Sequence, residues 1–181
     1  MKKIIIFCAG ILSLVACTNV SKPELPAAPA TPAGVKNSIG GKSYTVETIG
    51  LLSPFHGDSS INWNILKEDT TAFFKKWAAE QMVFTAAFSK DSSSEFYSPF
   101  DKKKTTGTYS VDSDPNLGYD EPRPGIKLRL KYLGSMGFSD DNTKSVMTLS
   151  FLVRGVNEKE LVLETGQSFN ERPLVVWMKS N

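Results

Sequence analysis

The chain contains few of the residues from which catalytic and metal sites are built. Its 181 residues include two cysteines, Cys8 and Cys17, and one histidine, His56. A transition-metal site of the usual His/Cys kind therefore lacks ligands, and a Ser-His-Asp enzyme would depend on His56, which Pro54 and Gly57 place in a loop. No Gly-x-Ser-x-Gly elbow, phosphate-binding glycine loop or dinucleotide fingerprint occurs. The sequence predicts a non-enzymatic protein without a cofactor or metal.

Long apolar runs are also scarce. The run from Ile4 to Leu14 is shorter than the roughly 18 residues that a membrane-spanning helix needs. Because Lys2 and Lys3 precede it, the pattern is typical of a secretory signal peptide.

The tetrapeptide Leu14-Val15-Ala16-Cys17 ends this run and resembles the lipobox of bacterial lipoproteins. The resemblance implies that residues 1–16 are removed as a signal peptide and that Cys17 carries diacylglycerol and a fatty acid such as palmitate. Thr18, in place of Asp, implies the outer membrane of the cell envelope. Cys17 would then be the one cysteine of the mature chain, which excludes an intrachain disulfide.

The net charge offers no general attraction for nucleic acid. The formal charge is +2, and removal of Lys2 and Lys3 takes Lys and Arg from 21 to 19, equal to the 19 Asp and Glu. A neutral protein has no global field that steers nucleic acid toward it. The basic run Lys102-Lys103-Lys104 is a local exception, interpreted as a hairpin tip or a guarded sheet edge, with contact to anionic lipid headgroups as the alternative.

Composition divides the remaining chain into a tether and a domain. Pro23, Pro26, Pro29 and Pro32 alternate with alanine and lack a repeating apolar residue. Such a segment cannot bury enough surface to fold, so residues 17–41 are predicted to be a disordered tether. Residues 42–181 are the length of a single ordinary domain.

The pattern of this domain is that of β-strands. Apolar and charged residues alternate in Gly125–Leu133 and again in Val146–Gly155, which predicts two strands with one face buried. Met82–Phe88 has apolar residues in both of its alternating sets of positions, which predicts a strand covered on both faces. Shorter candidates are Tyr44–Ile49, Ile61–Leu66, Glu95–Phe100, Gly107–Val111, Leu161–Thr165 and Leu174–Met178. The predicted inward residues include Phe84, Phe88, Tyr109, Leu128, Leu149 and Phe151.

Regular strand spacing predicts a mainly β fold. An antiparallel meander of about eight strands is expected, closed as a barrel or packed as a sandwich. One segment departs from this pattern: Asp69–Gln81 places Phe73, Phe74 and Trp77 at helical spacing. It predicts a short amphipathic helix that lies on or plugs the sheet, with a small apolar pocket near Trp77.

Lipobox, tether and meander together resemble the small lipocalin-like lipoproteins of bacteria. The chain has Gly41-Lys42-Ser43-Tyr44 where lipocalins have Gly-x-Trp near the first strand. The resemblance implies a β-barrel that holds a small apolar or amphipathic ligand.

One acidic segment has the spacing of a calcium loop. Asp112, Asp114, Asn116 and Asp120 fall at loop positions 1, 3, 5 and 9 within Asp112–Glu121. The sharp-turn position holds a leucine and the last position an arginine, so the main interpretation is a polar connection between strands, with calcium binding as the alternative.

Two functions follow from these patterns. The first is a lipid-anchored envelope protein that binds an apolar ligand in its barrel. The second is a structural or adhesin-like module that contacts other envelope proteins through its loops. The interior separates them: a roomy apolar pocket favours the ligand carrier, and a centre filled by side chains favours the interaction module.

Overall fold

The computed structural model describes residues 25–28, 31–53, 61–63, 85–98, 103–117, 123–135, 144–169 and 172–181. In this part of the chain one helix precedes nine strands. The elements are α1 (Pro32–Ile39), β1 (Lys42–Leu52), β2 (Ile61–Asn62), β3 (Thr85–Phe88), β4 (Ser93–Ser98), β5 (Lys103–Leu117), β6 (Arg123–Ser135), β7 (Lys144–Val156), β8 (Glu160–Phe169) and β9 (Arg172–Ser180).

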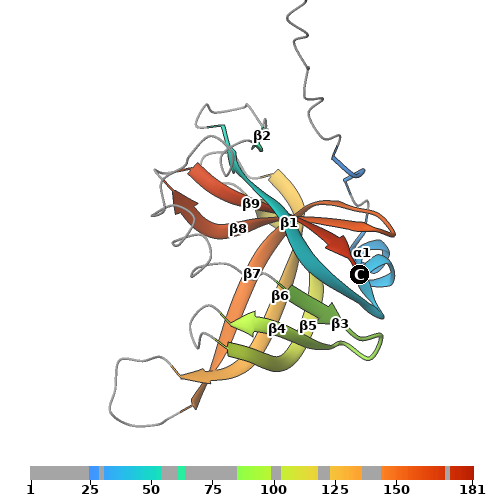
Figure 1. The fold of residues 1–181 in the computed structure, drawn as a ribbon, viewed down its shortest axis with the longest axis vertical. Coiled ribbons are helices and arrows are strands. Elements are labelled where there is room, and N and C mark those ends of the chain that lie inside the picture. The colour runs from blue at the N-terminus through green and yellow to red at the C-terminus, as the bar shows by residue number, and fades with distance from the viewer. Residues whose placement is uncertain are drawn as a thin grey trace, which may run out of the picture.

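Eight of the strands close into an antiparallel barrel (Figure 1). Strands β3 to β9 pair in chain order, and β1 pairs with both β3 and β9, which joins the two ends of the sheet. Strand β2 adds a short pairing at the end of β1. The predicted meander of about eight strands is confirmed, and closure selects the barrel over the sandwich because it leaves no long unpaired edge.

The two clearest predicted strands pair with each other as their alternation requires. Leu128 lies opposite Phe151 and Leu130 opposite Leu149 in the β6–β7 register. Leu128 and Leu130 are buried in the barrel, whereas Lys127 points to the outer face. Period-two alternation therefore marked the buried face of these strands correctly.

Burial on both faces occurs on β9, not on the strand for which it was predicted. In β3 only Ala86 and Phe88 are fully buried, and residues 82–84 lie outside the described part. In β9 all five residues of Leu174–Met178 are buried. A continuous apolar run is typical of a strand covered on both sides, and Leu174–Met178 is such a run.

The outer face of β1, β8 and β9 carries a second apolar layer, which sequence patterns missed. The rings of Trp63 and Trp177 meet edge to face with centroids 5.3 Å apart. The buried members of the layer are Leu52, Trp63, Val162, Val175 and Trp177.

Helix α1 corrects the predicted boundary of the tether. Thr31 caps it, since its Oγ1 accepts a hydrogen bond from Gly34 N at 3.1 Å, and Pro32 occupies the first turn. Val35 and Ile39 are completely buried in the barrel core. The prediction that residues 17–41 form a disordered tether is therefore wrong for Pro32–Ile39. The helix is also far too short to cross a membrane, and the described residues contain no other helix.

The segment before the helix also belongs to the fold. Pro26 is buried, and Val156 N at the end of β7 donates a hydrogen bond to Ala27 O at 3.3 Å. The folded domain thus includes residues from Leu25 onward, instead of beginning at Lys42. The tether was misassigned because the prediction relied on the proline and alanine content of the segment. It did not take into account Val35 and Ile39, whose side chains reach the core.

Replacing Gly155 with alanine is expected to displace this segment. A Cβ at position 155 would lie 2.4 Å from the carbonyl oxygen of Pro26, a distance that forces one backbone to move. The expected result is faster proteolysis between residues 25 and 31 with a loss of roughly 1 kcal/mol of stability. Gly166→Ala is the control, because nothing lies within 4 Å of a Cβ there; equal proteolysis of both variants would contradict the contact.

Candidate functional site

Among the residues that the structure describes, side chains fill the centre of the barrel. A cavity of about 10 Å³ remains among side chains contributed by five strands, β3, β6, β7, β8 and β9. This volume holds about one water molecule, whereas pockets for small organic ligands usually measure roughly 300–1,000 Å³. The lining residues are Ala86, Phe88, Leu128, Leu130, Phe151, Leu163, Thr165, Val176 and Met178.

Aromatic side chains close the interior at the end where β1 begins, hereafter the α1 end. Phe88 packs edge to face against Tyr44 and Tyr109, with ring centroids 6.0 and 5.1 Å apart. The Tyr109 hydroxyl donates a hydrogen bond to Ser89 O at 2.9 Å. Burial raises the pKa of Tyr44 to about 12, so its phenol stays neutral at physiological pH. The α1 end is packed as a core.

A second aromatic pair fills the other half of the interior. Phe96 and Tyr132 meet edge to face with centroids 5.3 Å apart. The Tyr132 hydroxyl and Ser98 Oγ share a buried hydrogen bond of 2.9 Å. The opposite end of the barrel, hereafter the far end, is where β1, β4, β6 and β8 finish; the connections there fall on residues outside the described part.

The polar groups in the described part of the interior are hydroxyls. They belong to Ser94, Ser98 and Thr165 and to the tyrosines Tyr44, Tyr109 and Tyr132. Among the described residues, no group of three or more His, Cys, Asp or Glu side chains could hold a metal ion.

The predicted site residues fall into two groups. Phe88, Tyr109, Leu128, Leu149 and Phe151 all belong to or pack against the interior cluster, as predicted. Cys17, His56, Phe84 and the predicted helix Asp69–Gln81, with Trp77 and its predicted pocket, lie outside the described residues.

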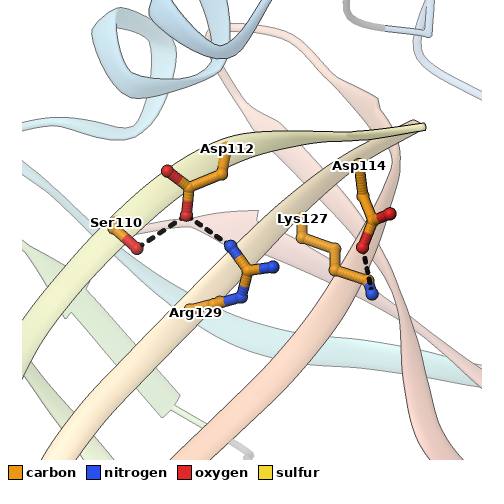
Figure 2. Close-up of polar contacts among 5 residues, drawn as sticks. All are labelled: Ser110, Asp112, Asp114, Lys127 and Arg129. Atoms are coloured by element: carbon orange, nitrogen blue, oxygen red, sulfur yellow. Dashed lines mark hydrogen bonds and ion pairs between the residues drawn. The ribbon is translucent and has the colours of Figure 1, made fainter. Parts of the chain in front are cut away.

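The acidic segment forms cross-strand ion pairs (Figure 2). Residues 112–117 continue β5, so Asp112, Asp114 and Asn116 lie in a strand and not in the predicted loop. Asp120 and Glu121 lie outside the described residues. Asp112 Oδ2 accepts hydrogen bonds from Arg129 Nη1 at 2.5 Å and from Ser110 Oγ at 3.0 Å, and Asp114 pairs with Lys127. Pairing with β6 overrides the turn-forming residues here, because each carboxylate meets a cation on the neighbouring strand.

Calcium is therefore expected to leave the stability unchanged. Addition of millimolar CaCl₂ to the metal-free protein should not raise the melting temperature, because Asp112 and Asp114 are already neutralised by Arg129 and Lys127. Asp112→Asn should lower stability by no more than about 1 kcal/mol, as exposed ion pairs contribute little. A calcium-dependent rise in melting temperature that Asp112→Asn abolishes would contradict this assignment.

Further ion pairs cover the outer face of the barrel. Arg154 pairs with Glu164 across β7 and β8, Lys104 Nζ lies 3.2 Å from Glu95 Oε1, and Lys179 Nζ lies 2.6 Å from Glu47 Oε1. Lys103 and Lys104 begin β5 and lie opposite Ser98 and Tyr97. Residues 103–106 pair with β4 alone, because the β5–β6 register begins at Gly107. This position agrees with the interpretation of the basic run as part of a hairpin or as a guarded edge; Lys102 lies outside the described residues.

The fold and its packed centre define this chain as an eight-stranded antiparallel β-barrel protein with a helix at one end. No family model, curated protein or solved structure matches its sequence or fold.

Proposed function

We propose that this protein is a non-enzymatic interaction module of the bacterial cell envelope, held to the outer membrane by lipid on Cys17. In this proposal the barrel is a rigid scaffold that contacts other envelope proteins through its outer surface. The observation that carries it is the packed centre, where the cavity of about 10 Å³ is far smaller than a fatty acid or sterol requires.

The N-terminal segment supports an oriented presentation of the barrel. Residues 18–24 lie between Cys17 and the segment that contacts β7. A stretch of seven residues can place Cys17 at most about 30 Å from Leu25. The α1 end would then face the membrane, and the far end would face away from it.

A ligand panel tests the packed-barrel function. Fatty acids, sterols and apolar dyes should not raise the melting temperature of the wild-type protein, because the cavity among the described core residues is too small to receive them. Leu128→Ala is the positive control, since it enlarges the cavity that Leu128 lines; this variant should gain binding of a small apolar probe such as benzene. One-site binding of a fatty acid or sterol by the wild-type protein would instead favour a ligand carrier.

Replacement of Cys17 tests the anchor separately. Cys17→Ser in the full chain should move the protein from the membrane fraction to the soluble fraction. Each methylene of the lipid that is buried in the bilayer contributes about 0.8 kcal/mol to membrane binding, and in this proposal the barrel contributes nothing to it. The melting temperature should not change. Unchanged retention in the membrane would contradict lipid attachment at Cys17.

A further inference from the structure

Two neighbouring apolar side chains are exposed on the outer face of the β6–β7 hairpin. Leu133 is 62% exposed and Val146 is 69% exposed, and the register places them directly opposite each other. In the described part of the chain, one other large apolar side chain, Leu25, is exposed. Cross-strand neighbours have Cβ atoms about 5 Å apart, so Leu133 and Val146 form one continuous apolar surface.

Two lysines bracket this apolar pair along the hairpin. In the register, Lys131 lies opposite Thr148, Leu133 opposite Val146, and Lys144 opposite Ser135. Lys131 and Lys144 are exposed and have no ion pair within the described residues. Lys127 and Arg129, further along the same strand, are neutralised by Asp114 and Asp112. Within the described residues, two positive charges without a counter-ion therefore lie beside exposed apolar surface.

The position of the hairpin favours contact with a partner. Strands β6 and β7 have 13 residues each, compared with six in β4, and their far end extends beyond β3, β4 and β5 (Figure 1). This end is opposite α1, so the proposed anchor would hold it away from the membrane.

We infer that Leu133 and Val146, with Lys131 and Lys144, form a docking surface for a partner protein that presents an apolar side chain flanked by carboxylates. The inference rests on the proposed interaction function and names the chemistry of its partner. The lysines argue against a second copy on the same surface, because two-fold pairing would place like charges together. The orientation argues against the lipid bilayer that holds the anchor.

A peptide-display selection tests this chemistry directly. A random 12-residue library is selected on the full mature protein, and enriched peptides are compared with those recovered on Leu133→Ser/Val146→Ser. The expected consensus places Leu, Phe or Trp beside Asp or Glu, with at least tenfold weaker binding to the double variant. Lys131→Glu/Lys144→Glu should also weaken binding at least tenfold, and increasingly so at low salt.

Matched controls separate the surface from general effects. Leu25→Ser removes the other exposed apolar side chain, and Lys159→Glu reverses an exposed lysine at the α1 end; both should bind the selected peptides as the wild type does. All variants should keep the wild-type melting temperature, because the substituted side chains lie outside the core.

Three results would overturn the inference. The first is a selection whose peptides lack the acidic and apolar consensus or bind the Leu133→Ser/Val146→Ser variant equally well. The second is self-association in sedimentation equilibrium that this variant abolishes. The third is cosedimentation of the non-lipidated Cys17→Ser protein with phosphatidylglycerol vesicles that the same surface substitutions abolish. None of these depends on the ligand panel, so failure here is distinguishable from failure of the packed-barrel function.

Discussion

A chain that begins at Lys42 is expected to be less stable than one that begins at Leu25 by about 3–5 kcal/mol. The shorter chain loses the complete burial of Val35 and Ile39, and full burial of each such side chain is worth about 1.5–3 kcal/mol. It also uncovers Tyr44, which packs directly under α1. Some of this loss is offset by the conformational entropy that the helix residues regain. Because small domains are stable by about 5–15 kcal/mol, the loss is a large share of the total.

Urea denaturation of the two chains measures this difference, and a pair of point variants localises it. Ile39→Ala should cost about 2–5 kcal/mol, whereas Asn37→Ala, at an exposed position of the same helix, should cost less than about 0.5 kcal/mol. Equal stability of the chains that begin at Lys42 and Leu25 would show that α1 is dispensable and would restore the predicted tether boundary.

Leu128→Ala is the second large effect, with an expected loss of about 2–5 kcal/mol. Leu128 is completely buried, and it lies opposite Phe151 on β7 and Val111 on β5. Truncation of this side chain enlarges the central cavity. The stability then falls by the transfer free energy of the removed methyl and methylene groups and by the van der Waals contacts that the lining atoms lose. The neighbouring variant Lys127→Ala should cost at most about 1 kcal/mol, because it breaks a partly exposed ion pair with Asp114.

Equilibrium unfolding in urea distinguishes these two variants if their m-values match that of the wild type. Comparable losses for Leu128→Ala and Lys127→Ala would mean that β6 is not a one-sided strand. A loss below about 1 kcal/mol for Leu128→Ala would mean that the barrel collapses around the vacated space.

Strand positions on β6 and β7 were predictable because their alternation is local. Each inward residue, such as Leu128 or Phe151, is two positions from the next, and the pleat alone then assigns it to a face. The boundaries of β5 were not predictable by the same means. Asp112 and Asp114 belong to residue types that favour turns, and the cations that hold them in a strand, Arg129 and Lys127, are contributed by another part of the chain.

The sequence by itself determined the mainly β fold and the antiparallel order of its strands, and it determined which face of β6 and β7 is buried, because periodicity and short connections express these features locally. The tertiary structure alone decided that the sheet closes and that α1 seals one end, because these depend on contacts between distant segments, such as β1 with β9. It also decided that the centre is filled, since a cavity is the difference between the enclosed volume and the side chains that enter it. That difference, and not the presence of apolar residues, separates a scaffold from a ligand carrier.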